Sequence, residues 1–362
     1  MKNKHQAKQF STIIGVDLGD KKHHLCITDK DGNILSETSI PNRKERLIQL
    51  AQEHSGALFA IEVGSHSPWI SRLLEENGCT CLVANARKLR AIYQNVRKCD
   101  QLDARMLAKL ARVDPELLSP VQHGTEDHQR HRLALTLRDS LVRQRVDIIN
   151  SVRFSLKSMG IRLPGGATSA FANKCRKEVE DATMLAAIEP SLKVLDEMGL
   201  QIKQLDRQII QTAAEFHPAT KLLEQIPGVG PITSLSFVLA VGDPQRFEDP
   251  RDVAAYMGLV PRRDQSGQSD KQLAISKAGN REMRRLLVQC AQYILGHFGP
   301  DCDLRTQGLK LAARGGKAAK RKAIIAIARK LAVLMLVLWK TGGSYEPLRK
   351  PESKSEAKAA AA

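Results

Sequence analysis

A chain of 362 residues is long enough for two or three domains with substantial hydrophobic cores. Its 56 Lys and Arg residues exceed its 39 Asp and Glu residues, and the net charge of +17 favours a polyanionic partner, either nucleic acid or an anionic membrane face. Aromatic residues make up only 4 %, which argues against a base-stacking platform for single strands and favours backbone and groove contacts by Lys and Arg.

The seven cysteines are scattered along the chain, and no two of them are spaced as Cys-x-x-Cys. This pattern indicates neither a zinc site nor a disulfide framework and predicts reduced intracellular thiols. The polar N-terminus has no apolar signal-peptide core. The most apolar stretch, residues 323–339, is interrupted by Arg329 and Lys330 and is too short to span a bilayer. We therefore expect a soluble cytoplasmic protein, associated with the nucleoid and not with a membrane.

The first third of the chain has the pattern of a mixed α/β sheet. Helices are expected after Pro41, from Pro68, and from an N-cap at Asp100. Runs of β-branched and apolar residues predict five strands, at 11–20 (running into a glycine turn), 25–28, 34–38, 57–62 and 80–84. Three consecutive strands followed by alternating helices and strands predict a mixed sheet.

Four acidic residues occupy related positions in this pattern. Asp17 ends the first strand, Glu62 ends the fourth, and Asp100 and Asp103 leave one face of the next helix. An acid at an apolar strand is costly to bury unless it is paired or binds a metal. Four such oxygen donors suit hard divalent cations, and two ions about 4 Å apart could clamp the attacking and leaving oxygens of a phosphodiester.

Each acid also has an ordinary explanation. Asp100 and Asp103 could cap a helix and face its dipole, Asp17 could be a turn aspartate, and Glu62 could be a strand-edge glutamate. The joint pattern, rather than any one acid, favours a metal site.

The middle of the chain, residues 123–218, is expected to be helical. Apolar residues recur at spacings of three and four over 126–159 and 184–216, which predicts two long helices. These helices could pack as a hairpin or pair between subunits. The Pro-Gly-Gly segment at 163–167 marks a loop tip.

Residues 222–233 have the pattern of a helix-hairpin-helix. A Pro-Gly-Val-Gly turn separates two apolar helices, and Gly228 and Gly230 allow backbone N–H groups to face a DNA phosphate. The alternative is an ordinary tight turn between packed helices.

The remaining chain alternates helices with polar segments. Asp249 and Pro250 are expected to start a helix that ends at 257–258, and a polar loop is expected at 259–269. Another helix follows residues 275–281. No acidic residue occurs between Leu304 and Tyr345, and this one-sided charge favours nucleic-acid contact over a merely solvated basic face. Residues 346–362 have the composition of a disordered tail.

Six motifs give the chain a resemblance to a known family. In order they are GVDLG around Asp17, AIEVG around Glu62, KCDQLDARMLA around Asp100 and Asp103, IPGVGPIT, GLVPRRDQSG and ISKAGNREMRRLL. The chain from about 13 to 339 resembles the DEDD transposases of bacterial insertion sequences, recombinases of the kind described as bridge-RNA-guided. The pattern cannot be placed over 270–274.

The resemblance implies a RuvC-like (ribonuclease H) α/β domain at 11–122, a helical coiled-coil region at 123–218 and a mainly helical C-terminal transposase domain at 219–345. It further implies that Asp17, Glu62, Asp100 and Asp103 hold Mg²⁺, as two ions, with no nucleotide cofactor. The family's catalytic serine falls on Ser266, which would attack a phosphodiester and carry the DNA end. A partner subunit of a homodimer or homotetramer would supply the acidic site.

The implied partners are double-stranded DNA, at the element ends and the target, and a structured noncoding guide RNA that pairs with both. Ser269 and Ser276 are rival nucleophiles, and Ser266 before a glycine is also an ordinary turn serine. Expected nucleic-acid contacts are Gly228, Gly230, Arg262, Arg263, Lys277, Arg281, Arg284, Arg285, Arg314, Lys317, Lys320, Arg321 and Lys322.

Three other functions remain open on the sequence. A metal-dependent nuclease or junction resolvase would use water as the nucleophile and leave Ser266 structural. A sugar-kinase-like or actin-like ATPase would need a second phosphate loop and an adenosine-binding glycine motif, and the sequence shows neither. A non-catalytic nucleic-acid binder would keep its biological activity without the four acids.

Overall fold

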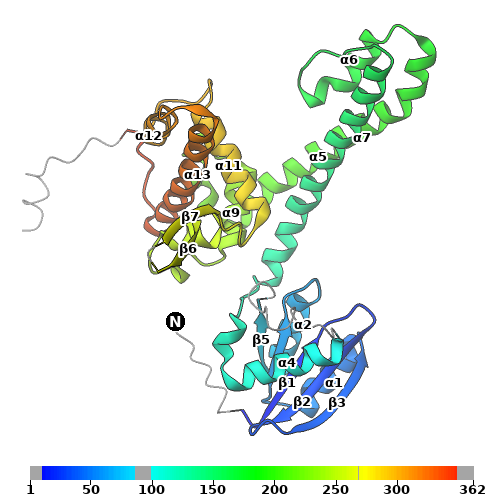
Figure 1. Cartoon of the computed structure of the whole chain (residues 1–362). Helices are drawn as coiled ribbons and strands as arrows, with labels where there is room; N and C mark the ends of the chain where they lie inside the picture. The colour runs from blue at the N-terminus through cyan, green and yellow to red at the C-terminus, as the bar shows by residue number, and fades with distance from the viewer. Residues whose placement is uncertain (1–9, 86–98, 268, 349–362) are drawn as a thin grey trace, which may run out of the picture. The chain divides into compact units, whose positions relative to one another are not determined.

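The computed structural model describes residues 10–85, 99–267 and 269–348 (Figure 1). The chain divides into two compact units, one up to Glu126 and one from Asp127, and each is described by itself. The second unit contains both the long helices and the C-terminal helices, so the finer boundary at 218/219 stays a prediction. The expected tail lies largely outside the described residues. No helix among these residues is long and apolar enough to cross a membrane.

The first unit is built on a five-stranded mixed sheet, as predicted. Its strand order is β3-β2-β1-β4-β5, with β1, β4 and β5 parallel and with β2 antiparallel to both β1 and β3. The strands are β1 (Thr12–Asp17), β2 (Lys22–Asp29), β3 (Ile34–Pro41), β4 (Leu58–Glu62) and β5 (Thr80–Ala84). β1 therefore lies in the centre, with its carboxyl end beside that of β4.

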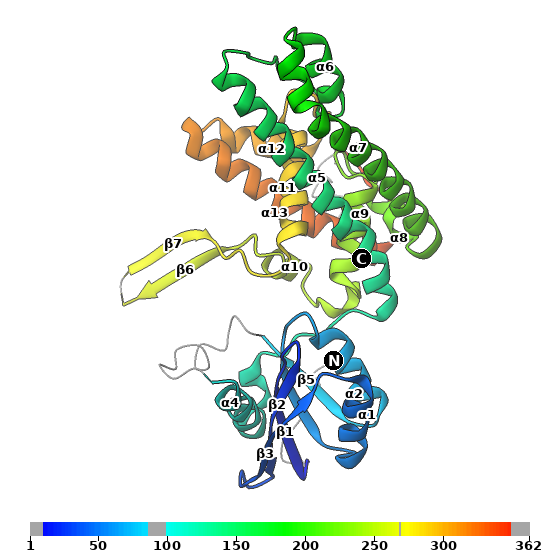
Figure 2. The same ribbon diagram turned by 90° about the vertical axis from the view of Figure 1, so that its right-hand side faces the viewer.

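Helices cover both faces of this sheet (Figure 2). α1 (Lys44–Glu53) and α2 (Ser67–Glu76) pack on one face through a buried cluster that includes Leu50, Ile70 and Phe59 of the sheet. α4 (Asp100–Val113) packs on the other face through a cluster that includes Leu107 and Ala60 of the sheet. The short 3₁₀ helix η2 (Pro115–Leu118) follows α4. Because both faces of the sheet are buried, the sequences of β1 and β4 are nearly continuous apolar runs.

The expected N-cap at Asp100 is wrong by one residue. Cys99 has the extended backbone of an N-cap, and Asp100 is the first residue of α4. Both Asp100 and Asp103 lie in the first turn, where the helix dipole favours negative charge.

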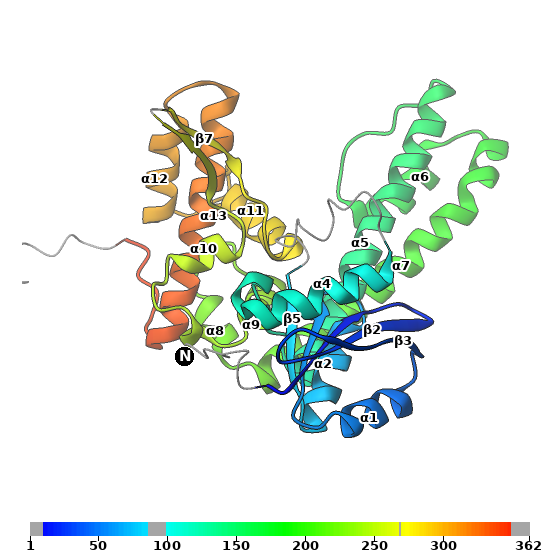
Figure 3. The same cartoon turned by 60° about the horizontal axis from the view of Figure 1, so that its bottom comes forward.

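The second unit begins with two long antiparallel helices, α5 (Glu126–Ser158) and α7 (Ala182–Phe216). Ile149 and Leu195 share one buried cluster, and Leu135 and Ile209 share another. The far end of the pair carries η3 (Thr168–Ala170) and α6 (Phe171–Glu178), which the sequence analysis had not foreseen (Figure 3). The predicted helical hairpin is present within one chain, and pairing between subunits stays a prediction.

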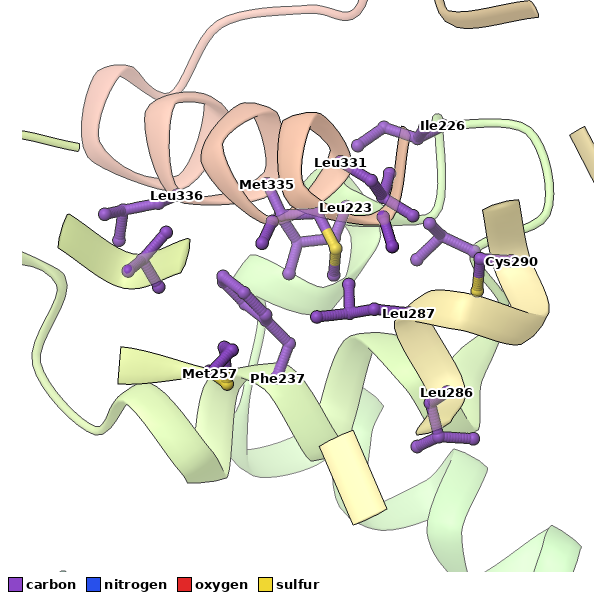
Figure 4. Close-up of a cluster of buried hydrophobic side chains, with 14 of the residues drawn as sticks. Leu223, Ile226, Phe237, Met257, Leu286, Leu287, Cys290, Leu331, Met335 and Leu336 are labelled. Carbon is purple, nitrogen blue, oxygen red and sulfur yellow. The ribbon is translucent and has the colours of Figure 1, made fainter. Parts of the chain in front are cut away.

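In the described part of this unit, seven further helical segments surround one large core (Figure 4). They are α8 (Ala219–Leu223), α9 (Pro231–Val241), η4 (Pro244–Arg246), α10 (Asp252–Tyr256), α11 (Arg281–Leu295), α12 (Asp303–Ala312) and α13 (Gly316–Thr341). Phe237 of α9, Leu287 of α11 and Met335 of α13 are each fully buried in this core. The Gly-Val-Gly turn joins α8 to α9, and its interpretation as a helix-hairpin-helix stays a prediction.

Two local expectations in this unit are wrong. Asp249 accepts a hydrogen bond from the backbone N–H of Arg251 in a turn, at 2.8 Å, and α10 begins only at Asp252. The expected polar loop at 259–269 is mostly part of an antiparallel hairpin, β6 (Pro261–Ser266) and β7 (Ser269–Ile275). Its polar side chains have low strand propensity, and both strands are exposed, so no apolar alternation announces them.

Candidate functional site

Asp17 and Glu62 lie side by side at one edge of the sheet. The pairing of β1 with β4 reaches Val16 and Ile61, and the two acids follow these residues directly. Successive strand residues point to opposite faces, so Asp17 shares a face with Gly15 and Glu62 shares that face with Ala60. That is the face covered by α4, and both acids are half-buried there.

Gly15 sets how closely α4 approaches β1. A Cβ atom on Gly15 would lie 2.0 Å from the carbonyl oxygen of Ala104 and 2.5 Å from the backbone nitrogen of Ala108. Only a residue without a side chain therefore allows this contact between helix and strand. The contact fixes the first turn of α4, with Asp103 directly before Ala104, close to the edge where β1 ends.

The two acids of α4 differ in environment. The Asp103 residue is 8 % exposed, whereas Asp100 is exposed. One carboxylate oxygen of Asp100 lies 3.6 Å from Nε2 of His24, and His24 pairs in register with Asp17 on the neighbouring strand. The structure thus brings all four predicted acids to the α4 face at one end of the sheet.

Arg105 of α4 binds the helix to strand β3. Its guanidinium donates two hydrogen bonds to the carboxylate of Glu37 on β3, at 2.8 and 2.7 Å. These hydrogen bonds hold the pKa of Glu37 below its usual value. Sequence reasoning missed Gly15, His24 and this ion pair. Only the glycine had a visible signal, as a residue with low strand propensity inside an apolar strand.

The chemistry of the four acids fits a hard divalent cation, because all four offer carboxylate oxygens. Their side chains do not form a closed cage: among the described residues, no three His, Cys, Asp or Glu side chains are grouped so that they could hold a metal ion. All seven cysteines lie within the described ranges and are free. The acids share an edge and a face, and their side chains would have to turn toward one another to enclose an ion.

Ser266 lies in the second unit, at the end of β6. It is exposed, pairs in register with Ser269, and is followed by Gly267 at φ +54°. The third candidate, Ser276, lies at the base of the same hairpin, where its N–H donates to the carbonyl of Val260 at 2.8 Å. The structure therefore puts Ser266 and Ser269 together near the hairpin tip and Ser276 away from it.

The Gly-Val-Gly turn opens onto a shallow hollow beside α11. Gly228 has φ +82°, and a Cβ there would lie 2.8 Å from the ring of Tyr293. Gly230 is the N-cap of α9, which has no side-chain cap. The hollow has a volume of about 500 Å³, and both glycines and Tyr293 line it. This arrangement leaves the N-terminus of α9 without a side-chain acceptor at the predicted phosphate contact.

Two groups can be distinguished among the expected basic contacts, and a few residues belong to neither. Arg284 donates to the carbonyl oxygens of Ala278 and Met257, at 2.8 and 3.1 Å, and Arg285 forms an ion pair with Asp139 of α5. These two arginines bind parts of their own unit. The exposed group surrounds the start of α13 and consists of Arg314, Lys317, Lys320, Arg321 and Lys322. Of the other expected contacts, Arg262 and Arg281 are exposed and Lys277 has φ +54°.

The exposed group surrounds the N-terminus of α13, where the helix dipole favours negative rather than positive charge. The first turn of α13 contains no acid, although the positive end of the helix dipole favours negative side chains there. We call Arg314, Lys317, Lys320, Arg321 and Lys322 the α13 basic surface. No ion pair joins any of them to another described residue, so their charge is available to a polyanion.

The chain is similar to known transposases over most of its length. Residues 14–161 match a family model for DEDD transposases of the IS110 type, described as "Transposase", and residues 220–307 match one described as "Transposase IS116/IS110/IS902 family". The transposase for insertion sequence element IS1111A of Coxiella burnetii is 27 % identical over 93 % of this chain and 92 % of its own length. The transposase for element IS1328 of Yersinia enterocolitica is 28 % identical over 78 % of this chain and 83 % of its own length.

A third relative carries a different name. The pilin gene-inverting protein of Moraxella bovis is 37 % identical over 134 residues, which are 36 % of this chain and 40 % of that protein. The two family models together match well over half of the chain, and the unmatched segment between them, residues 162–219, contains α6 and α7. The chain therefore belongs to the IS110/IS116 family of transposases, enzymes that cut and rejoin DNA.

Proposed function

We propose that this transposase cuts and rejoins DNA with a magnesium-binding acidic site and a serine nucleophile. The observation that carries the proposal is the placement of Asp17, Glu62, Asp100 and Asp103 on one face at one end of the sheet, from three separate elements. If their side chains turn toward one another, the four carboxylates repel unless a cation lies among them. Mg²⁺, as two ions, is the cation whose oxygen preference and phosphate chemistry suit both the site and the reaction.

Ser266 is the proposed nucleophile. Its exposed position near the tip of a hairpin makes its hydroxyl accessible to a DNA strand. Attack of Oγ on a phosphorus atom would form a serine–phosphate ester while the bond to the leaving sugar oxygen breaks and that oxygen takes up a proton. The ester keeps the energy of the phosphodiester, so the strand can be rejoined without ATP.

The α13 basic surface is the proposed polyanion contact of the second unit. Five exposed cations close together near the start of α13 repel one another, and nucleic-acid phosphates would relieve that repulsion. DNA is the substrate, and a noncoding guide RNA is the second proposed polyanion.

Purification of the protein under native conditions, followed by sequencing of any RNA that is bound, tests the guide RNA. A single structured RNA encoded in the flanking noncoding DNA would support it. Ribonuclease treatment that leaves the activity unchanged would contradict it.

A covalent-trapping experiment tests the serine mechanism. Wild-type protein, Ser266→Ala, Ser269→Ala and Ser276→Ala are incubated with Mg²⁺ and end-labelled duplex that carries an element end, and the mixtures are denatured before electrophoresis. We expect a protein–DNA adduct from every protein except Ser266→Ala. Nicked DNA without an adduct, unchanged in Ser266→Ala, would instead indicate a nuclease that uses water. An adduct lost only in Ser269→Ala or Ser276→Ala would move the role to that serine.

A further inference from the structure

The β6–β7 hairpin has little support from the rest of its unit. Every residue of β6 is exposed, and only Ile275 at the end of β7 is half-buried. Figure 2 shows the two strands extending beyond α10 and α11. Its base is held by backbone hydrogen bonds from Ser276 to Val260 and from Lys277 to Gly258, at 2.8 and 3.1 Å. A two-stranded hairpin by itself is marginally stable in water, so the far half needs its own stabilising contact.

That contact is an ion pair across the two strands. Nε of Arg263 donates to one carboxylate oxygen of Asp270 at 2.7 Å, and its Nη2 donates to the other at 2.6 Å. Such a two-pronged geometry fixes orientation as well as distance. The same hydrogen bonds hold the pKa of the Asp270 carboxyl below its usual value, so the pair is ionised at neutral pH.

The strand register puts this ion pair and Ser266 on opposite faces. Arg263 pairs with Gln272, and Gln265 pairs with Asp270. Residues opposite each other share a face and successive residues alternate, so Arg263 and Asp270 lie on one face of the hairpin. Ser266 is an odd number of residues from Arg263 and therefore lies on the other face. The guanidinium of Arg263 points away from the face on which Ser266 would meet a phosphate.

We propose that Arg263 and Asp270 are positioning residues: their ion pair holds the two strands of the hairpin together and thereby fixes the end of β6, which carries Ser266. This inference rests on the proposed role of Ser266. It gives Arg263 an intramolecular partner in place of the phosphate contact expected from the sequence. It also assigns a role to Asp270, in the segment where the family pattern could not be placed.

The first test uses the free full-length protein and needs no DNA. Hydrogen–deuterium exchange is measured on peptides covering β6 and β7 in wild type, Asp270→Asn and Asp264→Asn. Asp264→Asn is the matched control, because it removes the same charge from the same hairpin on the other face. We expect exchange of the hairpin amides to rise about fivefold in Asp270→Asn, near the upper end for an exposed ion pair, and to stay near wild type in Asp264→Asn. Equal exchange in wild type and Asp270→Asn would overturn the proposal.

The second test measures the rate of adduct formation at saturating DNA and the DNA dissociation constant. Arg263→Gln and Asp270→Asn should each slow adduct formation about fivefold with little change in affinity. The exchanged pair, Arg263→Asp with Asp270→Arg, should recover the rate to within about twofold, because the ion pair is restored with its charges reversed. Slowing by Arg263→Gln alone, together with weaker DNA binding, would show a phosphate contact instead.

The two tests separate the failure of this inference from that of the proposed function. If wild-type protein forms no Ser266-dependent adduct, the serine mechanism fails, and the exchange experiment still decides whether the ion pair orders the hairpin. If the adduct forms but neither single variant slows it, the serine mechanism stands and the positioning role is wrong.

Discussion

The backbone of Ala104 in α4 lies directly against Gly15 in β1, so closely that a Cβ on the glycine would be 2.0 Å from the Ala104 carbonyl oxygen. This contact joins the central strand that ends in Asp17 to the helix that carries Asp100 and Asp103. The relative placement of the predicted acids therefore depends on one residue that takes no part in chemistry.

Gly15→Ala should destabilise the first unit and displace α4. The added methyl group meets backbone atoms, which cannot rotate away, and such overpacking typically costs about 1–3 kcal/mol. Urea unfolding monitored in this unit measures the cost. Gly64→Ala is the control, because a Cβ there meets no atom within 4 Å. Equal stability of the two variants would mean that α4 does not lie on β1 in this way.

Removal of one acid should abolish the response to metal. If Mg²⁺ binds only the folded protein, it raises the melting temperature, by an amount set by the ratio of its concentration to its dissociation constant. We expect Asp103→Asn to lose this Mg²⁺-dependent increase and strand cleavage while DNA binding persists. Thermal unfolding with and without Mg²⁺ measures the effect, with Asp114→Asn, directly after the end of α4, as the control. Cleavage retained in Asp103→Asn would count against the metal role.

Neutral substitutions on the α13 basic surface should reduce the salt dependence of DNA binding. Each lost phosphate contact lowers the slope of log affinity against log salt by about 0.9 for duplex DNA, so Lys320→Gln with Arg321→Gln should lower it by about 1.8. Fluorescence anisotropy at several salt concentrations gives the slope. Lys203→Gln, an exposed lysine of α7, is the comparison variant. An unchanged slope would remove this surface from the interface.

The second unit should lose stability in mild acid through His217. This residue is 8 % exposed, and its Nε2 lies 2.9 Å from Nδ1 of His131. Burial, followed by the charges of His131 and His128, lowers the pKa of His217 to about 4. The unfolded chain binds this proton near pH 6.5, so stability is full above that pH and falls as the pH drops toward 4, by an amount of the order of 3 kcal/mol.

Denaturant unfolding at pH 7.5, 6 and 5 measures this loss. We expect His217→Gln to flatten the dependence between pH 6.5 and 4, whereas His297→Gln, at an exposed histidine, should follow wild type. A wild-type curve that does not fall in this range would contradict the buried neutral state of His217.

The elements of this protein could be predicted from its sequence because their signals are local. Runs of β-branched and apolar residues indicated all five strands of the first sheet, β5 with its bounds, and spacing of three and four indicated α5 and α7. The strand-end positions of Asp17 and Glu62 followed from the same patterns, because parallel neighbours bring their carboxyl ends to one edge.

Only the tertiary structure decided which side chains meet. Arg105 reaches Glu37 across 68 residues of sequence, and Arg285 reaches Asp139 across 146, so neither partner is visible in a local pattern. The β6–β7 hairpin was not predicted because its strands are exposed, apart from the half-buried Ile275. Without a buried face, a strand has no alternation of apolar and polar residues that the sequence could show. The sequence by itself thus indicated the elements that bury an apolar face and the strand-end positions of Asp17 and Glu62, because these signals are local. Only the tertiary structure decided how α4 packs on Gly15 and which side chains pair with the basic residues, because these contacts join residues far apart in the sequence.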